Sequence, residues 1–354
     1  MAKQKVGIAM SGGVDSSVTA SLLQQKGCDV HGFFMLLPVP GKERHVQRVR
    51  SVAEHLEIPL YCIDLQDLFN RKVIDYFIRT YLDGDTPNPC IVCNRQVKFG
   101  ALLNVMRSRG MDKMATGHYA RIRKKDTGEY ILQKGCDPKK DQSYFLCRLT
   151  QAQLENVILP LGDYTKEEVY GLAAALKLST IHGPESQDVC FLAGESVAAF
   201  FAGQGIGDRP GDIINTEGRV IGEHRGLWQY TVGQRKGLSI PDATPWYVYR
   251  LDAGNNRLVV CKKDRLFCRK VITRDVRWTG AAQPNPWRGR VQIRGRHLPS
   301  PATVAAGNNG EAVITFEAGQ RAITPGQFAV FYEDDFVAGS AVITGAIAGE
   351  DIDL

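Results

Sequence analysis

Hydrophobic and polar residues form alternating blocks along the first half of the chain. Four short apolar runs have the length and composition of buried strands, and segments with a one-sided apolar pattern of helical period separate them. Strands are expected at residues 6–10, 29–37, 60–65 and 113–120, and helices at 45–56, 99–110 and 164–178. The last helix opens with a capping box, Thr165 with Glu168. Strands that alternate with helices predict a parallel sheet covered on both faces, which is an α/β fold.

The pattern changes in the second half of the chain. Glycine and proline become frequent from about residue 200, and short alternating runs follow at 246–252, 256–262, 289–297, 311–316 and 328–335. Such runs, separated by turn residues, predict an all-β region that closes into a small barrel. We expect a parallel-sheet domain at 1–193, a small central domain at 194–268 and a C-terminal β-barrel at 269–354.

Composition is that of an ordinary globular protein. Hydrophobic residues make up 44% of the chain and charged residues 23%. No apolar run approaches the ~20 residues of a membrane span, and the first residues lack the apolar core of a signal peptide. We therefore expect a cytoplasmic protein with no membrane partner. In that compartment the nine cysteines argue against a framework of structural disulfides.

Positive charge is concentrated late in the chain. The net charge is only +6, yet residues 257–296 hold twelve lysines and arginines against two aspartates, together with Trp278 and Trp287. A basic strip with aromatic residues suits the phosphate backbone of a nucleic acid. The alternative is a solvated charged face, which is the usual explanation of a charge run.

The first strand leads into the string SGGVDS, residues 11–16, and then into a helical pattern. Free backbone N–H groups and the helix dipole make such a turn suitable for phosphate. Gly12 and Gly13 permit close approach, and the nearby serines can donate hydroxyl groups. Asp15 can meet a phosphate only through a bridging cation or act by orienting the loop. The spacing fits neither a P-loop nor a dinucleotide fingerprint, so we expect another kind of nucleotide loop, with magnesium.

Two cysteine sites are candidates for chemistry. The string DTPNPCIVCNRQVKFG holds Cys90 and Cys93 in what we expect to be a loop, and ESQDVCFLAGES holds Cys190 in another. The charges of Arg95 and Lys98 are expected to favour thiolate. A C-x-x-C can also be half of a zinc site, but no second pair exists in the sequence, so zinc is the weaker interpretation.

These strings together resemble a known family. SGGVDS is similar to the pyrophosphate loop of ATP pyrophosphatases. In order along the whole chain, the strings SGGVDS, GFFM, TPNPCIVCNRQVKF, ATGHYAR, KKDQSYFL, SQDVCF, GLWQYTVGQRKGL, PWYV and TPGQFAVFY resemble the tRNA-specific 2-thiouridylases of the MnmA/TrmU family. The resemblance implies an N-terminal PP-loop domain, similar to adenine nucleotide alpha hydrolases, then a small central domain and a C-terminal β-barrel that helps to hold tRNA.

The resemblance also implies an activity and its partners. ATP would adenylate the 2-oxygen of the wobble uridine, U34, and sulfur from a cysteine persulfide would replace it, giving 2-thiouridine, AMP and pyrophosphate. The implied cofactors are ATP and Mg²⁺. The implied partners are tRNAs for lysine, glutamate and glutamine and a persulfide donor such as a cysteine desulfurase or a relay protein.

Matching motifs give the cysteines their roles. Cys190 would carry the persulfide and Cys93 would be the nucleophile, with a transient Cys93–Cys190 disulfide. One alternative keeps the reaction but uses a [4Fe-4S] cluster on Cys90, Cys93 and Cys190, whose fourth iron binds sulfide. Another is a tRNA-binding paralogue that has lost turnover.

The remaining site residues come from the same matches. The positions that correspond to ATP contacts are Ala9, Met10, Ser11, Gly12, Gly13, Val14, Asp15, Ser16, Met35 and Gly117. The positions that correspond to the target base and to tRNA contacts are Asn88, Pro89, Cys90, His118, Lys140, Asp141, Gln142, Arg294, Gly295 and Gln327.

The chain departs from the family pattern at three places. The segment after Met35, residues 36–53, is basic where the family has aspartates and tryptophan, which puts a magnesium or partner contact there in doubt. Gly295 stands where an aromatic residue is usual, which weakens one stacking contact to tRNA. The segment 337–347 lacks the family's cysteine and glycine triplet. We expect a divergent member, whose tRNA set or sulfur donor could differ.

Overall fold

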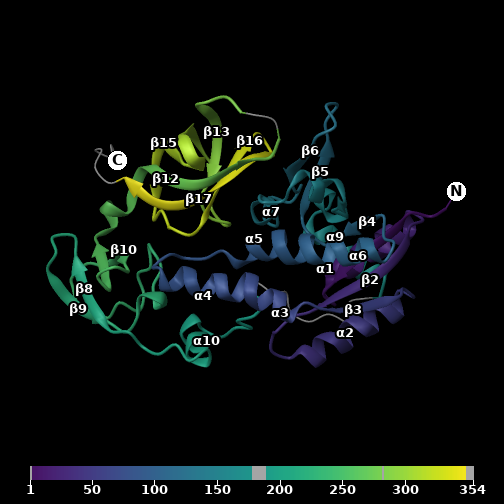
Figure 1. Ribbon diagram of the computed structural model, residues 1–354, viewed down its shortest axis with the longest axis horizontal. Helices are drawn as coiled ribbons and strands as arrows, with labels where there is room; N and C mark the ends of the chain where they lie inside the picture. Colours follow the sequence, from purple (N-terminus) through teal and green to yellow (C-terminus); the bar gives the residue numbers. More distant parts are fainter. Residues whose placement is uncertain (1, 178–188, 281–282, 348–354) are drawn as a thin grey trace. The chain divides into compact units, whose positions relative to one another are not determined.

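The computed structural model describes residues 2–177, 189–280 and 283–347 (Figure 1). Two compact units form within the chain. The α/β unit comprises Met1–Ile74, Pro89–Ala193 and Asp335–Val337, and the β unit comprises Asp75–Asn88, Gly194–Asp334 and Ala338–Leu354. Among the described residues, no helix has both the length and the apolar character needed to cross a membrane.

A five-stranded parallel sheet organises the α/β unit, as the sequence predicts. Its strand order is β3-β2-β1-β4-β7. The strands are β1 (Lys5–Met10), β2 (Asp29–Leu36), β3 (Leu60–Asp64), β4 (Lys113–Ala115) and β7 (Val157–Ile158). Successive strands leave β1 on one side and return on its other side at β4, so the loops after β1 and β4 meet at a topological switch point. This is where open parallel sheets bind ligands.

Helices cover the sheet on both faces. The helical segments of the α/β unit are α1 (Val14–Gln25), α2 (Lys42–His55), α3 (Gln66–Phe69), a π-helical turn at Asn70–Ile74, α5 (Pro89–Cys93), a π-helical stretch at Asn94–Leu102, α6 (Leu103–Ser108), α7 (Ser143–Leu146), α8 (Gln151–Glu155), a 3-10 turn at Pro160–Asp163 and α9 (Lys166–Ala175). Helix α9 packs its Val169 and Ala173 against Val18 and Leu22 of α1. The capping box that the sequence predicts at Thr165 is present.

Three details of the predicted pattern differ from the structure in this unit. The strand expected at 113–120 ends at Ala115 and resumes as β5 (Ala120–Lys124), which forms a hairpin with β6 (Tyr130–Lys134). The expected loop around Cys90 and Cys93 is helical from Pro89 onward. Proline fits the first position of a helix because its missing N–H would have no intrahelical partner there. The helix expected at 164–178 ends at Ala175, and Leu178 lies outside the described residues.

The β unit holds a four-stranded sheet and a closed barrel. The sheet has the order β10-β11-β8-β9, and the barrel has the order β12-β15-β14-β13-β16-β17, with β12 pairing back onto β17. Its elements are α4 (Asp75–Leu82), α10 (Val197–Gly203), β8 (Gly211–Asn215), β9 (Val220–His224), β10 (Tyr247–Asp252), β11 (Arg257–Cys261), β12 (Phe267–Trp278), β13 (Trp287–Gln292), β14 (Ser300–Ala306), β15 (Ala312–Arg321), β16 (Phe328–Glu333) and β17 (Phe336–Ile347), with 3-10 turns at Leu227–Gln229, Lys263–Leu266 and Asn308–Gly310.

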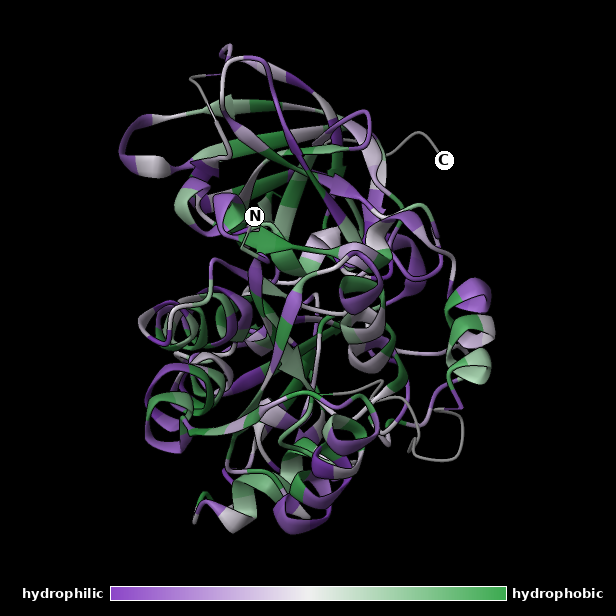
Figure 2. Ribbon diagram, turned by 90° about the vertical axis from the view of Figure 1, so that its right-hand side faces the viewer, coloured by the Kyte–Doolittle hydropathy of each residue, from purple (hydrophilic) through white to green (hydrophobic). Residues whose placement is uncertain are grey.

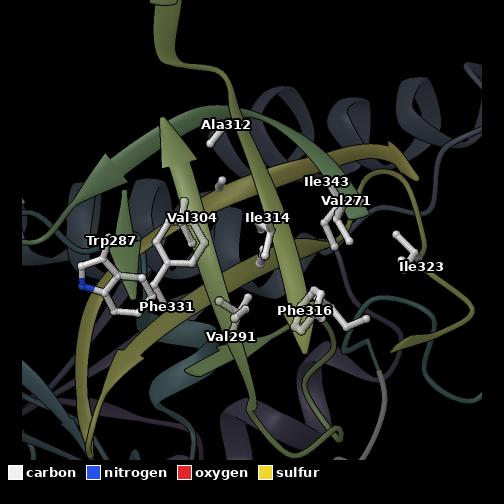
Figure 3. Packing of buried hydrophobic residues seen from close by; sticks show 14 of the residues in the cluster. Val271, Trp287, Val291, Val304, Ala312, Ile314, Phe316, Ile323, Phe331 and Ile343 are labelled. Carbon is white, nitrogen blue, oxygen red and sulfur yellow. The ribbon is translucent and has the colours of Figure 1, made fainter. Parts of the chain in front are cut away.

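The barrel interior is closed by apolar side chains from all its strands. Val304, Ile314 and Phe331 are among them (Figure 3). Trp287 is 3% exposed and packs with Trp278 and Phe331, with ring centroids 5.3–5.9 Å apart. Trp287 therefore belongs to the barrel core and does not face a nucleic acid, whereas the half-buried Trp278 packs against that core, and its place beside the arginines at a nucleic acid stays a prediction. Figure 2 shows that hydrophilic and hydrophobic residues are both present along the helices.

Candidate functional site

The SGGVDS string forms the loop between β1 and α1, and its own side chains hold it in shape. Ser11 Oγ accepts from the Gly13 N–H at 3.3 Å and lies 3.2 Å from Ser16 Oγ. The hydroxyl groups of Ser16 and Ser17 donate to the Gly13 carbonyl. The Ser17 hydroxyl group therefore uses its proton within the loop. The amides at the start of α1 have no intrahelical acceptor and remain able to bind an anion.

Helix α2 covers one side of this loop. Gly12 has φ +72°, and a methyl group built there would lie 3.1–3.2 Å from Val49 and Arg48. Glycine is required by the left-handed backbone and by this close packing. The basic segment that follows Met35 in this chain thus folds into the helix that supports the pyrophosphate loop.

Asp15 is the acidic residue of the loop, and its carboxylate is engaged within the α/β unit. Its Oδ1 accepts a hydrogen bond from Tyr119 Oη at 2.7 Å and forms an ion pair with Lys166 Nζ at 2.8 Å. Its carbonyl accepts from Thr19 Oγ1. These contacts favour the role of orienting the loop, one of the two roles that the sequence leaves open for this residue.

The segment from Thr116 to Tyr119, which follows β4, lies directly against the pyrophosphate loop. A methyl group built at Gly117 would come within 2.8 Å of the Asp15 carbonyl carbon and 3.0 Å of the Ser16 nitrogen. Gly117 therefore makes room for the loop backbone. The sequence predicts an ATP contact there, which stays a prediction.

The next residue of that segment turns toward the cysteines. His118 Nε2 lies 3.5 Å from Lys98 Nζ, and His118 Nδ1 lies 2.7 Å from Thr116 Oγ1. Because the Lys98 ammonium can only donate, Nε2 accepts and Nδ1 carries the proton. Burial, and then the charge of Lys98, hold the pKa of His118 well below its usual value. The imidazole is therefore neutral at pH 7.

The three cysteines come from two distant parts of the chain and interact electrostatically with one another and with Lys98. Burial raises the pKa of Cys93 to about 12 and that of Cys90 to about 11, against a smaller lowering by Lys98. Cys190 is exposed as a residue, yet burial of its sulfur also raises its pKa, and Lys98 again opposes the change.

Lys98 favours the thiolate form, as expected, but the net shift in the free protein is toward the protonated thiol. Burial outweighs the single ammonium of Lys98. Lys98 acts on all three sulfurs.

Within the described ranges, no group of three or more His, Cys, Asp or Glu side chains is arranged to hold a metal ion. Cys90, Cys93 and Cys190 all lie in those ranges. As placed, these three thiols do not form a preformed iron–sulfur site.

Two of the residues predicted to contact tRNA, Asp141 and Gln142, make hydrogen bonds to the backbone of the α/β unit. Asp141 accepts from the N–H groups of Gly135 and Ser143, and Gln142 Oε1 accepts from the Tyr119 N–H. Lys140 is partly exposed, and Met35 is half-buried near the end of β2. Their contacts with tRNA and with adenine stay predictions.

In the β unit, Gln327 holds the segment that leads into the cysteine helix. Its Nε2 donates to the carbonyls of Thr86 and Pro87 at 2.9 and 3.0 Å, and its Oε1 accepts from Asn88 Nδ2 at 3.4 Å. Gly326, with φ +86°, packs so closely that a methyl group there would lie 2.7 Å from the Thr86 oxygen. Asn88 is followed directly by Pro89, the first residue of α5.

Arg294 also bonds within the β unit. Its Nη2 donates to the carbonyls of Val232 and Ala322 and to Thr324 Oγ1. The Gly295 carbonyl accepts from Gln292. The guanidinium ties the loop after β13 to two other segments, and its predicted contact with tRNA remains untested.

Sequence reasoning missed Lys166 and Tyr119, which hold Asp15, and the contact between Lys98 and His118. Lys166 follows the capping-box threonine and resembles any helix-starting lysine. Only its burial, at 7% exposure, would have distinguished it, and burial of a lysine is not visible in sequence.

Comparison with known proteins assigns the chain to a family. Residues 4–194 match the family model described as tRNA methyl transferase HUP domain, residues 200–262 match the tRNA methyl transferase PRC-barrel domain, and residues 268–343 match the aminomethyltransferase beta-barrel domain. The HUP match implies an ATP-dependent domain.

Relatives match over almost the full length. The tRNA-specific 2-thiouridylase MnmA of Desulfotalea psychrophila is 44% identical over 97% of this chain and 100% of its own. That of Moorella thermoacetica is 44% identical over 95% of this chain and 98% of its own. Because these relatives are 44% identical and match over almost the full length of both chains, the chain belongs to the tRNA-specific 2-thiouridylase MnmA family.

Proposed function

We propose that this protein replaces the 2-oxygen of the wobble uridine in tRNA by sulfur, using ATP to activate the oxygen and a cysteine persulfide as the sulfur source. The observation that carries the proposal is the segment from Thr116 to Tyr119. Its Gly117 packs on the pyrophosphate loop, and its His118 contacts Lys98, which acts on all three cysteines. A nucleotide-binding loop and a group of thiols are thereby connected by four consecutive residues.

Activation is required because the uracil C2 carbonyl is a poor electrophile and hydroxide is a poor leaving group. In the proposed first step, the 2-oxygen attacks the α-phosphorus of ATP, and the bond to pyrophosphate breaks. The amides at the start of α1 would bind the phosphates and stabilise the charge that develops on the leaving pyrophosphate. AMP then becomes the leaving group at C2.

The second step transfers sulfur with balanced electrons. The terminal sulfur of a Cys190 persulfide attacks C2 and expels AMP, which retains the uracil oxygen. The Cys93 thiolate attacks Cys190 Sγ, the sulfur–sulfur bond to the uridine breaks, and its electron pair leaves with the 2-thiouridine. Two cysteine sulfurs are oxidised to a disulfide while the transferred sulfur is reduced, so a dithiol reductant must restore both cysteines before the next turnover.

The raised pKa of Cys93 affects this step. A buried thiol with a pKa of about 12 is a weak nucleophile at pH 7. We propose that Lys98 supplies the positive charge that lets Cys93 ionise once the substrate is bound. The neutral His118 acceptor would hold the Lys98 ammonium in place beside the sulfurs.

The residues of the site are compatible with Mg²⁺ bound to ATP but not with an iron–sulfur cluster. Asp15 Oδ1 already receives two donors, so we propose that Mg²⁺ is carried by the phosphate oxygens of ATP. The three cysteines as placed do not fit a [4Fe-4S] cluster.

The test combines the purified protein with ATP, Mg²⁺, a persulfide donor and unmodified tRNA. We expect 2-thiouridine at the wobble position, and no product from Cys190→Ser. Thiolation that survives in Cys190→Ser would overturn the persulfide assignment. Anaerobic purification with iron analysis separates the routes, because an iron-free active enzyme supports the persulfide route and activity that requires iron supports the cluster.

A further inference from the structure

Lys166 places a buried ammonium group behind the pyrophosphate loop. Its side chain is 9% exposed, and Nζ lies 2.8 Å from Asp15 Oδ1, whose own side chain is 32% exposed. The Lys166 N–H donates to Asp137 Oδ2 at 3.0 Å, and Nζ lies 4.8 Å from the centre of the Tyr170 ring. Lys166 is therefore held at its backbone N–H by Asp137 and at its ammonium group by Asp15 and the Tyr170 ring.

This position is unfavourable for a lysine in the absence of a specific role. Lys166 is the first residue of α9, where the helix dipole repels a cation. Burial of an ammonium adds a desolvation cost unless an anion compensates. Departures from local preference of this kind are most common at functional sites.

Lys166 offsets the negative charge of Asp15, which lies close to the proposed phosphate site. Asp15 is the second residue of α1, at the helix end where the phosphates of ATP are proposed to bind. An unpaired carboxylate there would repel a triphosphate. The ion pair with Lys166 cancels that charge, and the shared hydrogen bond from Tyr119 fixes the carboxylate.

We propose that Lys166 is a positioning residue for ATP: it neutralises and orients Asp15, so that the loop presents its amides to the phosphates without a net negative charge. This inference rests on the proposed binding of ATP to the loop. It assigns Lys166 an action through Asp15 and no direct contact with the nucleotide.

The experiment measures the dissociation constant of Mg·ATP by equilibrium dialysis, without tRNA, for the full chain. We expect Lys166→Met to weaken binding about tenfold or more, and the loss to shrink in high salt. Lys166→Arg keeps the charge and should remain within about threefold of the wild type.

The double variant separates positioning from direct contact. Once Asp15→Asn has removed the carboxylate, removing Lys166 as well should change ATP binding by less than about threefold. A further loss of tenfold or more in Asp15→Asn/Lys166→Met, relative to Asp15→Asn, would mean that Lys166 touches the nucleotide and would overturn the proposal. This comparison still decides the matter if Lys166→Met alone does not fold, because removing both charges leaves no buried ion unpaired.

Arg123→Met is the matched control. It breaks an exposed ion pair of the same unit, Arg123 Nη2 to Asp163 Oδ1 at 3.0 Å, and should leave ATP binding unchanged. If the wild type binds ATP but Lys166→Met binds it equally well, the positioning role is wrong. If the wild type binds no ATP, the proposed function fails instead.

Discussion

The pyrophosphate loop and the cysteines of the α/β unit are prepared for chemistry to different degrees. The loop is held by hydrogen bonds among Ser11, Gly13 and Ser16, and its one acidic side chain already has an ion-pair partner. The cysteines have raised pKa values and one compensating ammonium. The loop is therefore already ordered in the free protein for its proposed binding of ATP, whereas the proposed chemistry of the thiols requires that they first be activated.

The difference has a chemical benefit. A thiolate exposed at all times would react with oxidants or stray electrophiles, whereas a protonated, buried thiol does not. We propose that sulfur transfer is thereby confined to the state in which activated tRNA is bound. The following variants test the two regions separately, from the largest expected effect to the smallest.

Cys93→Ser should separate the two regions most clearly. We expect 2-thiouridine formation, measured by mass spectrometry of digested tRNA, to fall by more than about 1000-fold because no thiolate can release the transferred sulfur. ATP binding should not change. Cys62→Ser, which alters an exposed cysteine of β3, should keep full activity. Substantial thiolation by Cys93→Ser would contradict the assigned role.

Gly117→Ala disturbs the loop and leaves the thiols intact. The added methyl group would lie 2.8–3.0 Å from the backbone of Asp15 and Ser16, so the loop must shift. We expect weaker ATP binding and a free energy of unfolding lower by about 1–3 kcal/mol in urea titrations. Gly171→Ala has open space around it in α9 and should be neutral or stabilising by about 0.5–1 kcal/mol. Equal behaviour of the two variants would contradict the packing argument.

The pH dependence of alkylation tests the thiols directly. Because burial raises the pKa of Cys93 to about 12, its reaction with iodoacetamide should still accelerate at pH 10, where an ordinary thiol has levelled off. Peptide mapping by mass spectrometry follows Cys93 alone. Lys98→Met should slow the alkylation of Cys93 about tenfold relative to the wild type, and Lys98→Arg should retain most of the wild-type rate. A plateau near pH 7 would show that the thiol is already activated.

The raised pKa values of the two buried cysteines also predict how the stability of the fold depends on pH. The folded state keeps Cys90 and Cys93 protonated up to about pH 11 and 12, while the unfolded chain releases these protons near its ordinary cysteine pKa. The two protonated thiols therefore make their full contribution to the free energy of unfolding below about pH 8.5. This contribution decreases as the pH rises above that value, because the unfolded chain then releases protons that the folded state keeps.

Gln327→Ala should have the smallest effect. It removes the donors to the Thr86 and Pro87 carbonyls, and we expect the free energy of unfolding to fall by about 1–2 kcal/mol and thiolation to fall several-fold. Gln320→Ala, whose side-chain amide donates to the Ala318 carbonyl of the same strand, is the control. Weaker tRNA binding without loss of stability would favour the tRNA contact that the family resemblance implies.

The sequence predicts the loop of this site better than its buried groups. The loop depends on residues close together in the sequence, whereas the buried groups depend on contacts between distant residues. The strand, loop and helix around SGGVDS follow from local rules, and the family resemblance identifies the loop. The helical start at Pro89 was missed because proline both ends helices and begins them. The raised pKa values of the cysteines depend on burial by residues distant in sequence, and so does the pairing of Asp15 with Lys166, 151 positions away.

The central claim is that ATP held by the loop activates the uracil oxygen for displacement by sulfur. The most direct measurement uses tRNA with ¹⁸O at the 2-position of the wobble uridine and analyses the AMP by mass spectrometry. Displacement of the adenylated oxygen predicts one ¹⁸O in AMP for each 2-thiouridine formed, with one pyrophosphate released. Thiolated tRNA accompanied by unlabelled AMP, or by no AMP at all, would contradict the account.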